Sequence, residues 1–286
     1  DKDDLACIIY TSGTSARPKG VMLTHGSIME NLKGAKRFVD DIETQSHKFL
    51  SILPLSHAYE HTGGFLLPIL IGGEIFFSNN RDQLLSDLQY AKPTLMVAVP
   101  RLYDILYKRI LTNIKSKGKI TKLLFFKTLE IGEQKYKKEN LSFVDKILDK
   151  FLELLIRKKI KKIFGGNLIA FISGGAALNF NSGIFFTSLG IKILQGYGQT
   201  ECSPIISVNP IDKIKIHTVG VPIANHFVKL SKSKEILVKG PSVMKGYLKD
   251  KKSTNITIKN GWLHTGDLGE IDKDKYLTIV GRKNEM

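Results

Sequence analysis

The sequence predicts an α/β fold in which mostly parallel sheets are flanked by helices and followed by a small antiparallel β-subdomain. In the first 210 residues, short apolar runs alternate with helical patterns, which is typical of a largely parallel sheet. Beyond about Pro210 the runs become shorter and are separated by turn signals such as Asn260-Gly261. We therefore expect an α/β core over residues 1–210 and a β-subdomain over residues 211–280.

The core elements follow from hydrophobic periodicity and from start and stop signals. We expect a helix from Thr24, as N-cap, to about Val39, and a second helix over residues 83–91. The first strand has the β-branched content of a buried strand. The pattern places the core strands at residues 5–10, 49–53, 74–77, 94–99, 167–172 and 191–194.

A helical insert near residues 101–165 interrupts this alternation with long, lysine-rich segments. Within it, residues 143–164 carry apolar side chains at helical spacing. Five cations gather at the end of this helix: Arg157, Lys158, Lys159, Lys161 and Lys162. Two interpretations stay open, because such a helix can lie on a membrane or can pack on its own domain with its cations near the helix C-terminus.

The composition excludes several classes of protein. A hydrophobic fraction of 42% and a charged fraction of 24% are typical of a soluble globular chain. The formal charge is +16, but it comes from 36 lysines and only 7 arginines, which argues against selection for nucleic-acid binding. A basic surface still favours acidic ligands such as ATP, CoA or anionic lipid.

The cysteines and the apolar runs bear on localisation. Cys7 and Cys202 form neither a disulfide framework nor a metal-binding spacing, which favours a reducing cytoplasm. The longest apolar run, residues 65–77, is broken by proline and glycine and falls short of the roughly 20 residues that span a bilayer. No signal peptide is visible. We expect a cytoplasmic protein, either free or peripheral at the inner face of a membrane.

Polar, glycine-rich stretches follow three of the predicted strands. The first has the composition of a phosphate-binding loop, although it does not fit the P-loop pattern. Its hydroxyl donors, its glycine and its cation are Thr11, Ser12, Gly13, Thr14, Ser15 and Lys19. The other two stretches are residues 173–178 and 195–201. Ligands of open α/β sheets bind beyond the carboxyl ends of the strands, so we expect the three loops to face one nucleotide.

Four motifs carry a family resemblance. Residues 10–21 closely resemble the signature loop YTSGTTGxPKGV of the adenylate-forming enzymes, the superfamily of acyl-CoA synthetases, luciferases and peptide-synthetase adenylation domains. Residues 195–201 match its QGYGxTE motif, residues 262–267 resemble WxxTGD, and residues 281–283 resemble the start of the GRxK hinge motif. Ala16 and Asn284 depart from the pattern, where relatives have Gly and either Asp or Lys.

The resemblance implies a role for each matching residue. Residues 11–15 and Lys19 would cradle pyrophosphate, Glu201 would hold Mg²⁺, and Thr200 would touch the phosphate. Asp267 would accept the ribose hydroxyls, and Arg282 would add a ribose or phosphate contact. The remaining residues would lie around the adenine, with Tyr197 packed on the base: Gly174, Gly175, Ala176, Gln195, Gly196, Tyr197 and Gly198.

Further motifs resemble the long-chain fatty acyl-CoA synthetase branch. Residues 53–60 resemble LPLAHxxE, and residues 99–103 resemble VPRxxE/Y. His57 and the Gly63-Gly64 pair would line the acyl site, with His57 counted among the catalytic residues. Alternatively, His57 only caps a helix.

The resemblance therefore implies ATP-dependent activation of a long-chain fatty acid to acyl-AMP and then acyl-CoA, with ATP and CoA as cosubstrates and Mg²⁺ as cofactor. Two alternatives stay open: transfer of the acyl group to a carrier protein, and a non-catalytic nucleotide-binding remnant. Relative to the family, we expect the chain to be truncated at both ends. Residues 281–286 only begin the hinge, so the chain alone would be incomplete for full turnover.

Overall fold

The computed structural model describes residues 1–11, 18–78 and 83–283. Their contacts divide the chain into two compact units, which are treated separately below. The first unit comprises Asp1–Glu43, Leu53–Gly72 and Gln195–Met286, and the second comprises Thr44–Ile52 and Gly73–Leu194. These units interleave along the chain and do not coincide with the expected division at residue 210.

A parallel sheet lies at the centre of the second unit. Its strands are β3 (Lys48–Ser51), β4 (Glu74–Phe77), β5 (Leu95–Ala98) and β6 (Ala170–Ser173), in the order β4-β3-β5-β6. Each neighbouring pair is parallel. The predicted parallel α/β core is thus confirmed in this unit.

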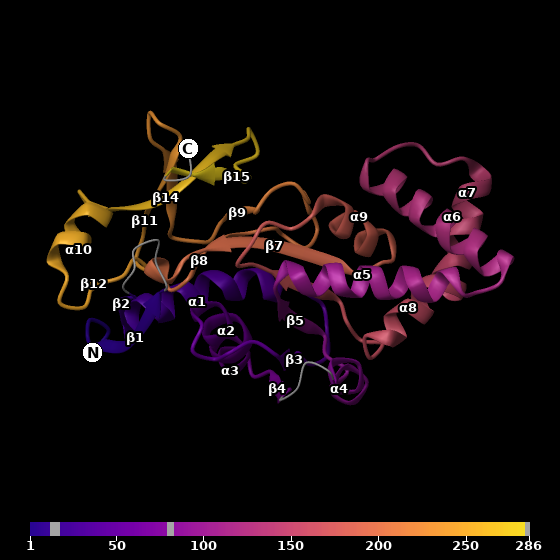
Figure 1. Ribbon diagram of the computed structural model, residues 1–286, viewed down its shortest axis with the longest axis horizontal. Helices are drawn as coiled ribbons and strands as arrows, with labels where there is room; N and C mark the ends of the chain where they lie inside the picture. The colour runs from indigo at the N-terminus through magenta and orange to yellow at the C-terminus, as the bar shows by residue number, and fades with distance from the viewer. Residues whose placement is uncertain (12–17, 79–82, 284–286) are drawn as a thin grey trace. The chain divides into compact units, whose positions relative to one another are not determined.

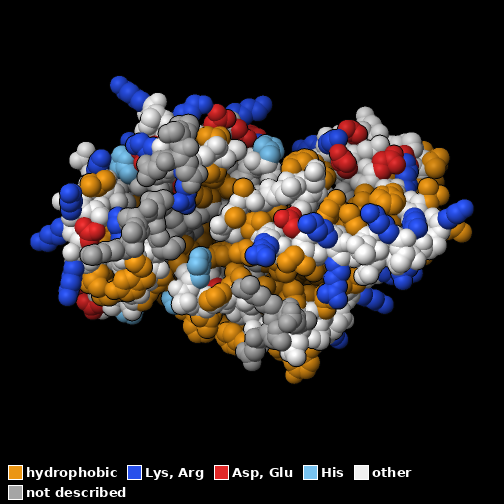
Figure 2. Space-filling view, in the orientation of Figure 1, with side chains coloured by type: hydrophobic (Ala, Val, Ile, Leu, Met, Phe, Trp, Pro, Cys, Tyr) orange, Lys and Arg blue, Asp and Glu red, His pale blue; other side chains and the backbone are white. Residues whose placement is uncertain are grey.

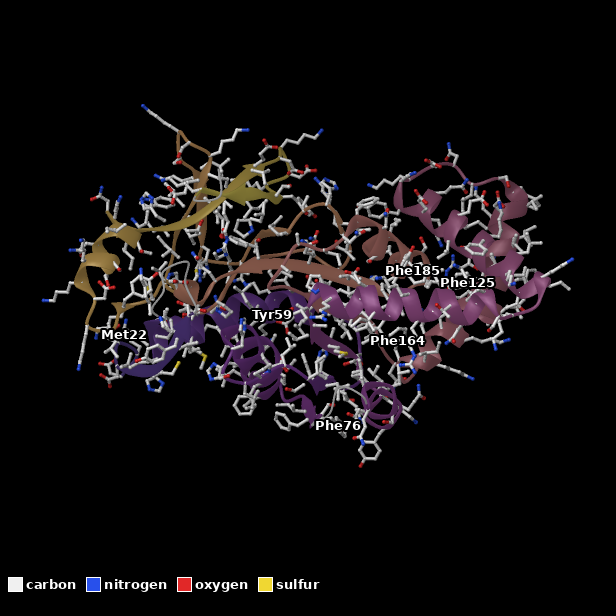
Figure 3. The ribbon with its side chains drawn as sticks, viewed as in Figure 1. Met22, Tyr59, Phe76, Phe125, Phe164 and Phe185 are labelled. Atoms are coloured by element: carbon white, nitrogen blue, oxygen red, sulfur yellow. The ribbon has the colours of Figure 1, made fainter. Side chains whose placement is uncertain are left out.

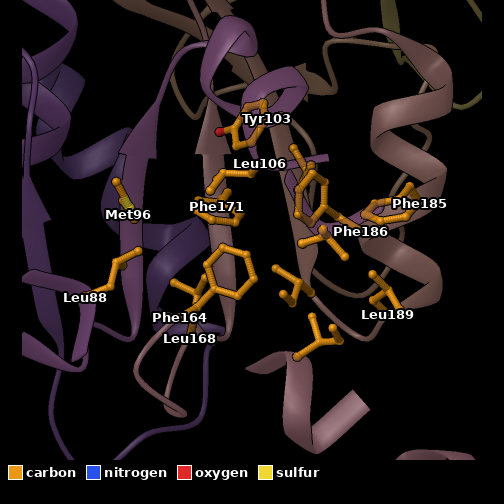
Figure 4. Packing of buried hydrophobic residues seen from close by; sticks show 14 of the residues in the cluster. Leu88, Met96, Tyr103, Leu106, Phe164, Leu168, Phe171, Phe185, Phe186 and Leu189 are labelled. Carbon is orange, nitrogen blue, oxygen red and sulfur yellow. The ribbon is translucent and has the colours of Figure 1, made fainter. Parts of the chain in front are cut away.

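Helices supply the rest of the second unit (Figure 1). They are α4 (Leu84–Ala91), α5 (Pro100–Lys115), α6 (Lys119–Tyr136), α7 (Phe143–Leu152), the π-helical turn η3 (Glu153–Arg157), α8 (Lys158–Ile163) and α9 (Phe180–Ser188). Figure 4 shows the core between the sheet and these helices, where Tyr103 packs edge-on against Phe171 with ring centroids 5.1 Å apart. Figure 3 places Phe125 of α6 near Phe185 of α9, at a centroid distance of 6.1 Å.

The helix expected over residues 143–164 is a run of α7, η3 and α8. One face of this run belongs to the core of the second unit, through Leu152, Ile156 and Ile160. The packing interpretation is therefore confirmed for this face. No helix among the described residues has both the length and the apolar composition to cross a bilayer.

The first unit contains an antiparallel sheet where we expected a buried strand. β1 (Leu5–Thr11) pairs antiparallel with β2 (Lys19–Thr24), and β12 (Gly246–Tyr247) pairs with the other edge of β2. The expectation of a buried first strand was wrong, because Leu5 is 43% and Tyr10 is 64% exposed. An apolar run does not reveal whether one or both faces of its strand are covered.

A second correction concerns residues 195–198, which lie in a strand rather than in a loop. β7 runs over Lys192–Gly198, and its last residues pair antiparallel with β8 (Ile205–Val208). β8 in turn pairs with β9 (Val221–Pro222). The ladder to β8 extends the strand through the glycines, and local sequence could not reveal this partner.

The predicted β-subdomain is confirmed as an antiparallel sheet of the first unit. Its order is β10-β11-β14-β13, with β15 also paired to β14. The strands are β10 (Phe227–Leu230), β11 (Glu235–Lys239), β13 (Ile258–Lys259), β14 (Trp262–Ile271) and β15 (Leu277–Arg282). The helical elements of the unit are α1 (His25–Asp40), α2 (Ala58–Glu60), η1 (His61–Leu66), α3 (Leu67–Leu70), η4 (Thr200–Cys202) and α10 (Lys251–Thr257).

Helix α1 begins where the sequence predicts and anchors η4. Thr24 caps the helix: its Oγ1 accepts from the Ser27 amide at 3.1 Å, while its own amide donates to Ser27 Oγ. One turn further on, the fully buried Asn31 donates to the carbonyls of Cys202 and Ile205 at 3.0 and 2.8 Å. Asn31 Oδ1 also accepts from the Ile205 amide at 3.1 Å. One side chain therefore ties α1 to both ends of the segment after Glu201.

Replacing Asn31 with Ala should lower the free energy of unfolding of the first unit by about 2–3 kcal/mol, because buried backbone groups of Cys202 and Ile205 lose their partner. Urea denaturation followed by circular dichroism measures this change. The control Lys36→Ala removes a surface ion pair on the same helix and should cost about 0.5 kcal/mol or less. Equal effects of the two variants would contradict the anchoring role of Asn31.

Candidate functional site

Glu201, Tyr247 and Lys19 form one cluster in the first unit. The Tyr247 hydroxyl donates to Glu201 Oε1 at 2.7 Å, and Lys19 Nζ lies 5.0 Å from the centroid of the Tyr247 ring. The tyrosine thus contacts both the lysine at the end of the expected phosphate loop and the carboxylate expected to hold a metal. Sequence reasoning gave Tyr247 no role.

Backbone bonds hold Tyr247 in this cluster. β12 pairs with β2 in the register Tyr247↔Val21, and the Leu248 amide donates to the Gly20 carbonyl at 2.8 Å. On the other side, the Met244 amide donates to the Glu201 carbonyl at 2.9 Å. Burial and the neighbouring Glu201 charge raise the pKa of Tyr247, so its hydroxyl stays protonated and donates to the carboxylate.

Asp267, Tyr197 and Arg282 form a second cluster in the same unit. Asp267 and Arg282 are direct partners across β14 and β15, and Arg282 Nε lies 3.3 Å from Asp267 Oδ1. The Tyr197 hydroxyl, from the end of β7, donates to Asp267 Oδ2 at 2.6 Å. Burial, and then the Asp267 charge, raise the pKa of Tyr197. Three sequence motifs that lie far apart therefore meet at one carboxylate.

Glu235 supports the turn before Asp267, and sequence reasoning missed it. Its carboxylate is 4% exposed and accepts from the Gly266 amide at 3.2 Å and from Lys283 Nζ at 3.0 Å. His264 Nδ1 lies 3.3 Å from the same carboxylate. Burial alone would raise the pKa of Glu235, but the bonds to Lys283 and His264 outweigh it and lower that pKa. Gly266 has φ +75°, a conformation that favours glycine at this turn.

Close packing against neighbouring backbone explains why positions 196 and 198 are glycines. A Cβ at Gly198 would collide with the Pro204 carbonyl, and one at Gly196 would lie 2.9 Å from the Ser207 carbonyl oxygen. Both contacts come from β8 and the residue before it. Gln195 is buried, and its carbonyl accepts from the Asn209 amide at 3.0 Å. A role of these residues toward a nucleotide remains a prediction, as it does for Thr200 at the start of η4.

The expected adenine loop lies in the second unit, directly after β6. The Gly174 amide donates to the Ala98 carbonyl at 3.4 Å. Gly175 has φ +80°, which only glycine adopts readily, and Ala176 follows it. This backbone is compatible with the expected close approach to a ligand.

The expected phosphate loop is described only at its two ends. Thr11 and Lys19 are paired residues of β1 and β2. Ser12, Gly13, Thr14 and Ser15 lie outside the described residues, as do Ala16 and Asn284.

His57 caps α2, as the alternative interpretation predicted. Its Nδ1 accepts from the Tyr59 amide at 3.3 Å, and the side chain is exposed. The glycine pair lies in η1, where a Cβ at Gly64 would sit 2.5 Å from Glu60 Oε1. Gly64 therefore makes room for a buried carboxylate of its own unit. A role of His57 toward an acyl group remains a prediction.

The donor set around Glu201 suits a metal that is shared with a phosphate. Among the described residues, no three or more His, Cys, Asp or Glu side chains gather in a way that could hold a metal ion. Mg²⁺ in phosphate sites commonly takes one or two carboxylates and completes its octahedron with phosphate oxygens and water. The single carboxylate of Glu201 fits that pattern.

Comparison with known proteins gives sequence relatives along the whole chain. The profile described as AMP-binding enzyme matches residues 1–248. The long-chain-fatty-acid–CoA ligase FadD15 of Mycobacterium bovis is 32% identical over 99% of this chain and 47% of its own length. Long-chain-fatty-acid–CoA ligase 5 of Mus musculus is 34% identical over 99% of this chain and 43% of its own length. The chain thus spans less than half of these curated relatives.

Solved structures share the fold. The ATP-bound RpMatB-BxBclM chimera B1 superposes with a TM-score of 0.73 at 25% identity, covering 100% of this chain and 49% of the chimera. The o-succinylbenzoate CoA synthetase (MenE) of Bacillus subtilis, in complex with its acyl-adenylate intermediate, gives a TM-score of 0.73 at 20% identity, covering 99% of this chain and 50% of MenE. The latter likeness concerns the fold alone.

Glu235 should make the stability of the first unit depend on pH. Because its pKa is lower in the folded state than in the unfolded chain, its ionised form stabilises the fold above the unfolded value of about 4.3, and this contribution is lost as the pH falls through the folded pKa. Glu235→Gln should therefore cost about 1–3 kcal/mol near pH 7 and flatten the loss of stability below about pH 5.

Urea denaturation across this pH range measures the effect. Glu139→Gln is the matched control, since Glu139 is exposed. A Glu235→Gln curve parallel to that of the wild type would rule out the proposed support of the turn.

Proposed function

This chain belongs to the AMP-binding enzyme family, and we propose that it is the adenylating part of an ATP-dependent long-chain fatty acid–CoA ligase. The observation that carries the proposal is the Asp267 carboxylate of β14, held by Tyr197 of β7 and Arg282 of β15. The substrate class is supported by the relatives with 32% and 34% identity, which are long-chain-fatty-acid–CoA ligases. Because this chain spans less than half of these relatives, the ligase activity is proposed for the whole protein to which the chain belongs.

In the proposed adenylation, a fatty acid carboxylate oxygen attacks the α-phosphorus of ATP. An O–P bond forms, the bond between the α- and β-phosphates breaks, and pyrophosphate leaves. For this reaction the protein mainly has to position the two substrates and to compensate the negative charge of the phosphates; it does not have to form a covalent bond itself. Asp267 would accept the ribose hydroxyls and fix the nucleoside, while Lys19 would offset charge on the departing phosphates.

Glu201 would hold Mg²⁺ together with phosphate oxygens, and the bound ion would neutralise part of the triphosphate charge. Tyr247 would act as a positioning residue, because its hydrogen bond fixes one oxygen of Glu201. In the second half-reaction, the CoA sulfur would attack the acyl carbonyl carbon and AMP would leave. No described cluster specifies the acceptor, so a carrier-protein thiol is the alternative that a test has to separate.

Pyrophosphate exchange into ATP tests the function directly. With fatty acids of rising length, we expect exchange that increases toward long chains and requires Mg²⁺. Supplying CoA or a phosphopantetheinylated carrier protein then identifies the acceptor from the thioester formed. If no fatty acid supports exchange, either by this chain alone or with a hinge and C-terminal domain appended, although ATP still binds, the chain is a nucleotide-binding remnant and the proposed activity is wrong.

Tyr247→Phe should weaken Mg²⁺-dependent ATP binding roughly tenfold, because a hydrogen bond to a charged group is lost. Glu201→Gln should abolish the Mg²⁺ dependence itself. AMP binding should stay unchanged in both variants, which isothermal titration calorimetry can check. The matched control is Tyr90→Phe, at a side chain that is 80% exposed. Unchanged Mg²⁺-ATP affinity in the Tyr247→Phe variant would contradict the proposed positioning role of Tyr247.

A further inference from the structure

The helical run α7–η3–α8 has two apolar faces, of which only one belongs to the core. On the inner face Leu152, Ile156 and Ile160 are at most 7% exposed. We call the opposite side the outer face. Its large apolar side chains are 45–78% exposed: Phe143, Val144, Ile147, Phe151, Leu154 and Leu155.

The outer face is a strip and not a set of scattered side chains. At 3.6 residues per turn, the four exposed apolar residues of α7 fall within about 100° of one another. Polar residues normally occupy this side of a surface helix, and soluble monomers rarely expose large contiguous apolar patches. Figure 2 shows exposed hydrophobic side chains between lysines over the part of the chain that contains α5, α6 and α7.

The charge that accompanies the outer face is positive. Asp145 pairs with Lys127 at 3.1 Å, and Asp149 pairs with Arg157 at 2.7 Å. Arg157 is itself buried and donates from Nε to the Ser188 carbonyl at 2.9 Å, so this arginine points into the unit. Exposed lysines without a carboxylate partner among the described residues remain: Lys146, Lys150, Lys158, Lys159 and Lys162.

We propose that the outer face of α7–η3–α8 docks onto the surface of an anionic lipid bilayer. Apolar side chains would enter the boundary between headgroups and acyl chains, while the unpaired lysines would face lipid phosphates. Charge complementarity selects this occupant, because five free cations flank an apolar strip whose neighbouring carboxylates are already paired. The helix would lie in the plane of the interface. This inference is independent of the proposed catalytic function.

Vesicle sedimentation tests the proposal with the whole chain. The wild type should bind phosphatidylglycerol vesicles, bind phosphatidylcholine vesicles far more weakly, and dissociate as salt is added. Neutralising Lys158, Lys159 and Lys162 to Gln should lower the partition coefficient roughly 100-fold. The matched triple Lys232→Gln, Lys239→Gln and Lys273→Gln changes exposed lysines of the first unit and should leave binding within about twofold of the wild type.

A second pair of changes tests the apolar part of the outer face. Phe143→Ser with Phe151→Ser should release the protein from vesicles but leave its urea denaturation midpoint unchanged, because both rings are exposed. Equal binding to neutral and anionic vesicles, or equal losses in the two lysine triples, would overturn the proposal. So would the absence of vesicle binding together with a dimer that the phenylalanine changes dissociate, since the outer face would then be covered by a second copy.

Discussion

The Asp267 side chain is almost inaccessible to water, and a buried carboxylate is stable only where donors face it. Tyr197 and Arg282 supply those donors, each from a different strand. The position of the end of β7 relative to β14 and β15 is thereby tied to one carboxyl group. Glu235 is a second buried carboxylate that donors surround, because it accepts from the Gly266 amide and from Lys283 Nζ. Two carboxylates, on the neighbouring strands β11 and β14, thus organise this part of the sheet.

In the same unit, a second group of segments that lie far apart in the sequence meets at Tyr247. β2, η4 and β12 come from three distant parts of the sequence, and backbone bonds bring them together. Asn31 of α1 also binds Cys202 of η4 and Ile205 of β8. The carboxylate of Glu201 is consequently oriented by fold contacts before any ligand binds. Such preorganisation is what electrostatic stabilisation of a polyphosphate requires.

Local signals were sufficient wherever the neighbours along the chain decide the structure. The Thr24 cap, strand β4 and the β-hairpins beyond residue 210 were predictable for this reason. The first strand and residues 195–198 were not, because their partners, β2 and β8, determine their exposure and their extent. Interleaving of the two units also has no local signal.

For the candidate site, the motifs identified Asp267 and Arg282, but only the strand register makes them partners. Tyr247 and Glu235 act through contacts with residues tens of positions away, so periodicity and spacing could not reveal them. For the glycines of β7, by contrast, the sequence motif suggested a role that the structure does not require. Their motif pointed to a ligand, whereas the backbone of β8 and Pro204 already explains why Gly196 and Gly198 carry no side chain.

The central claim is that Asp267 is the ribose anchor of a nucleotide site. A double-mutant cycle tests it most directly: the affinities of AMP and 2′-deoxy-AMP are measured for the wild type and for Asp267→Ala. We predict that removing the hydroxyl weakens binding to the wild type roughly tenfold and has no effect on the variant. The same loss in both proteins would mean that the ribose is held elsewhere, and the account of this site would be wrong.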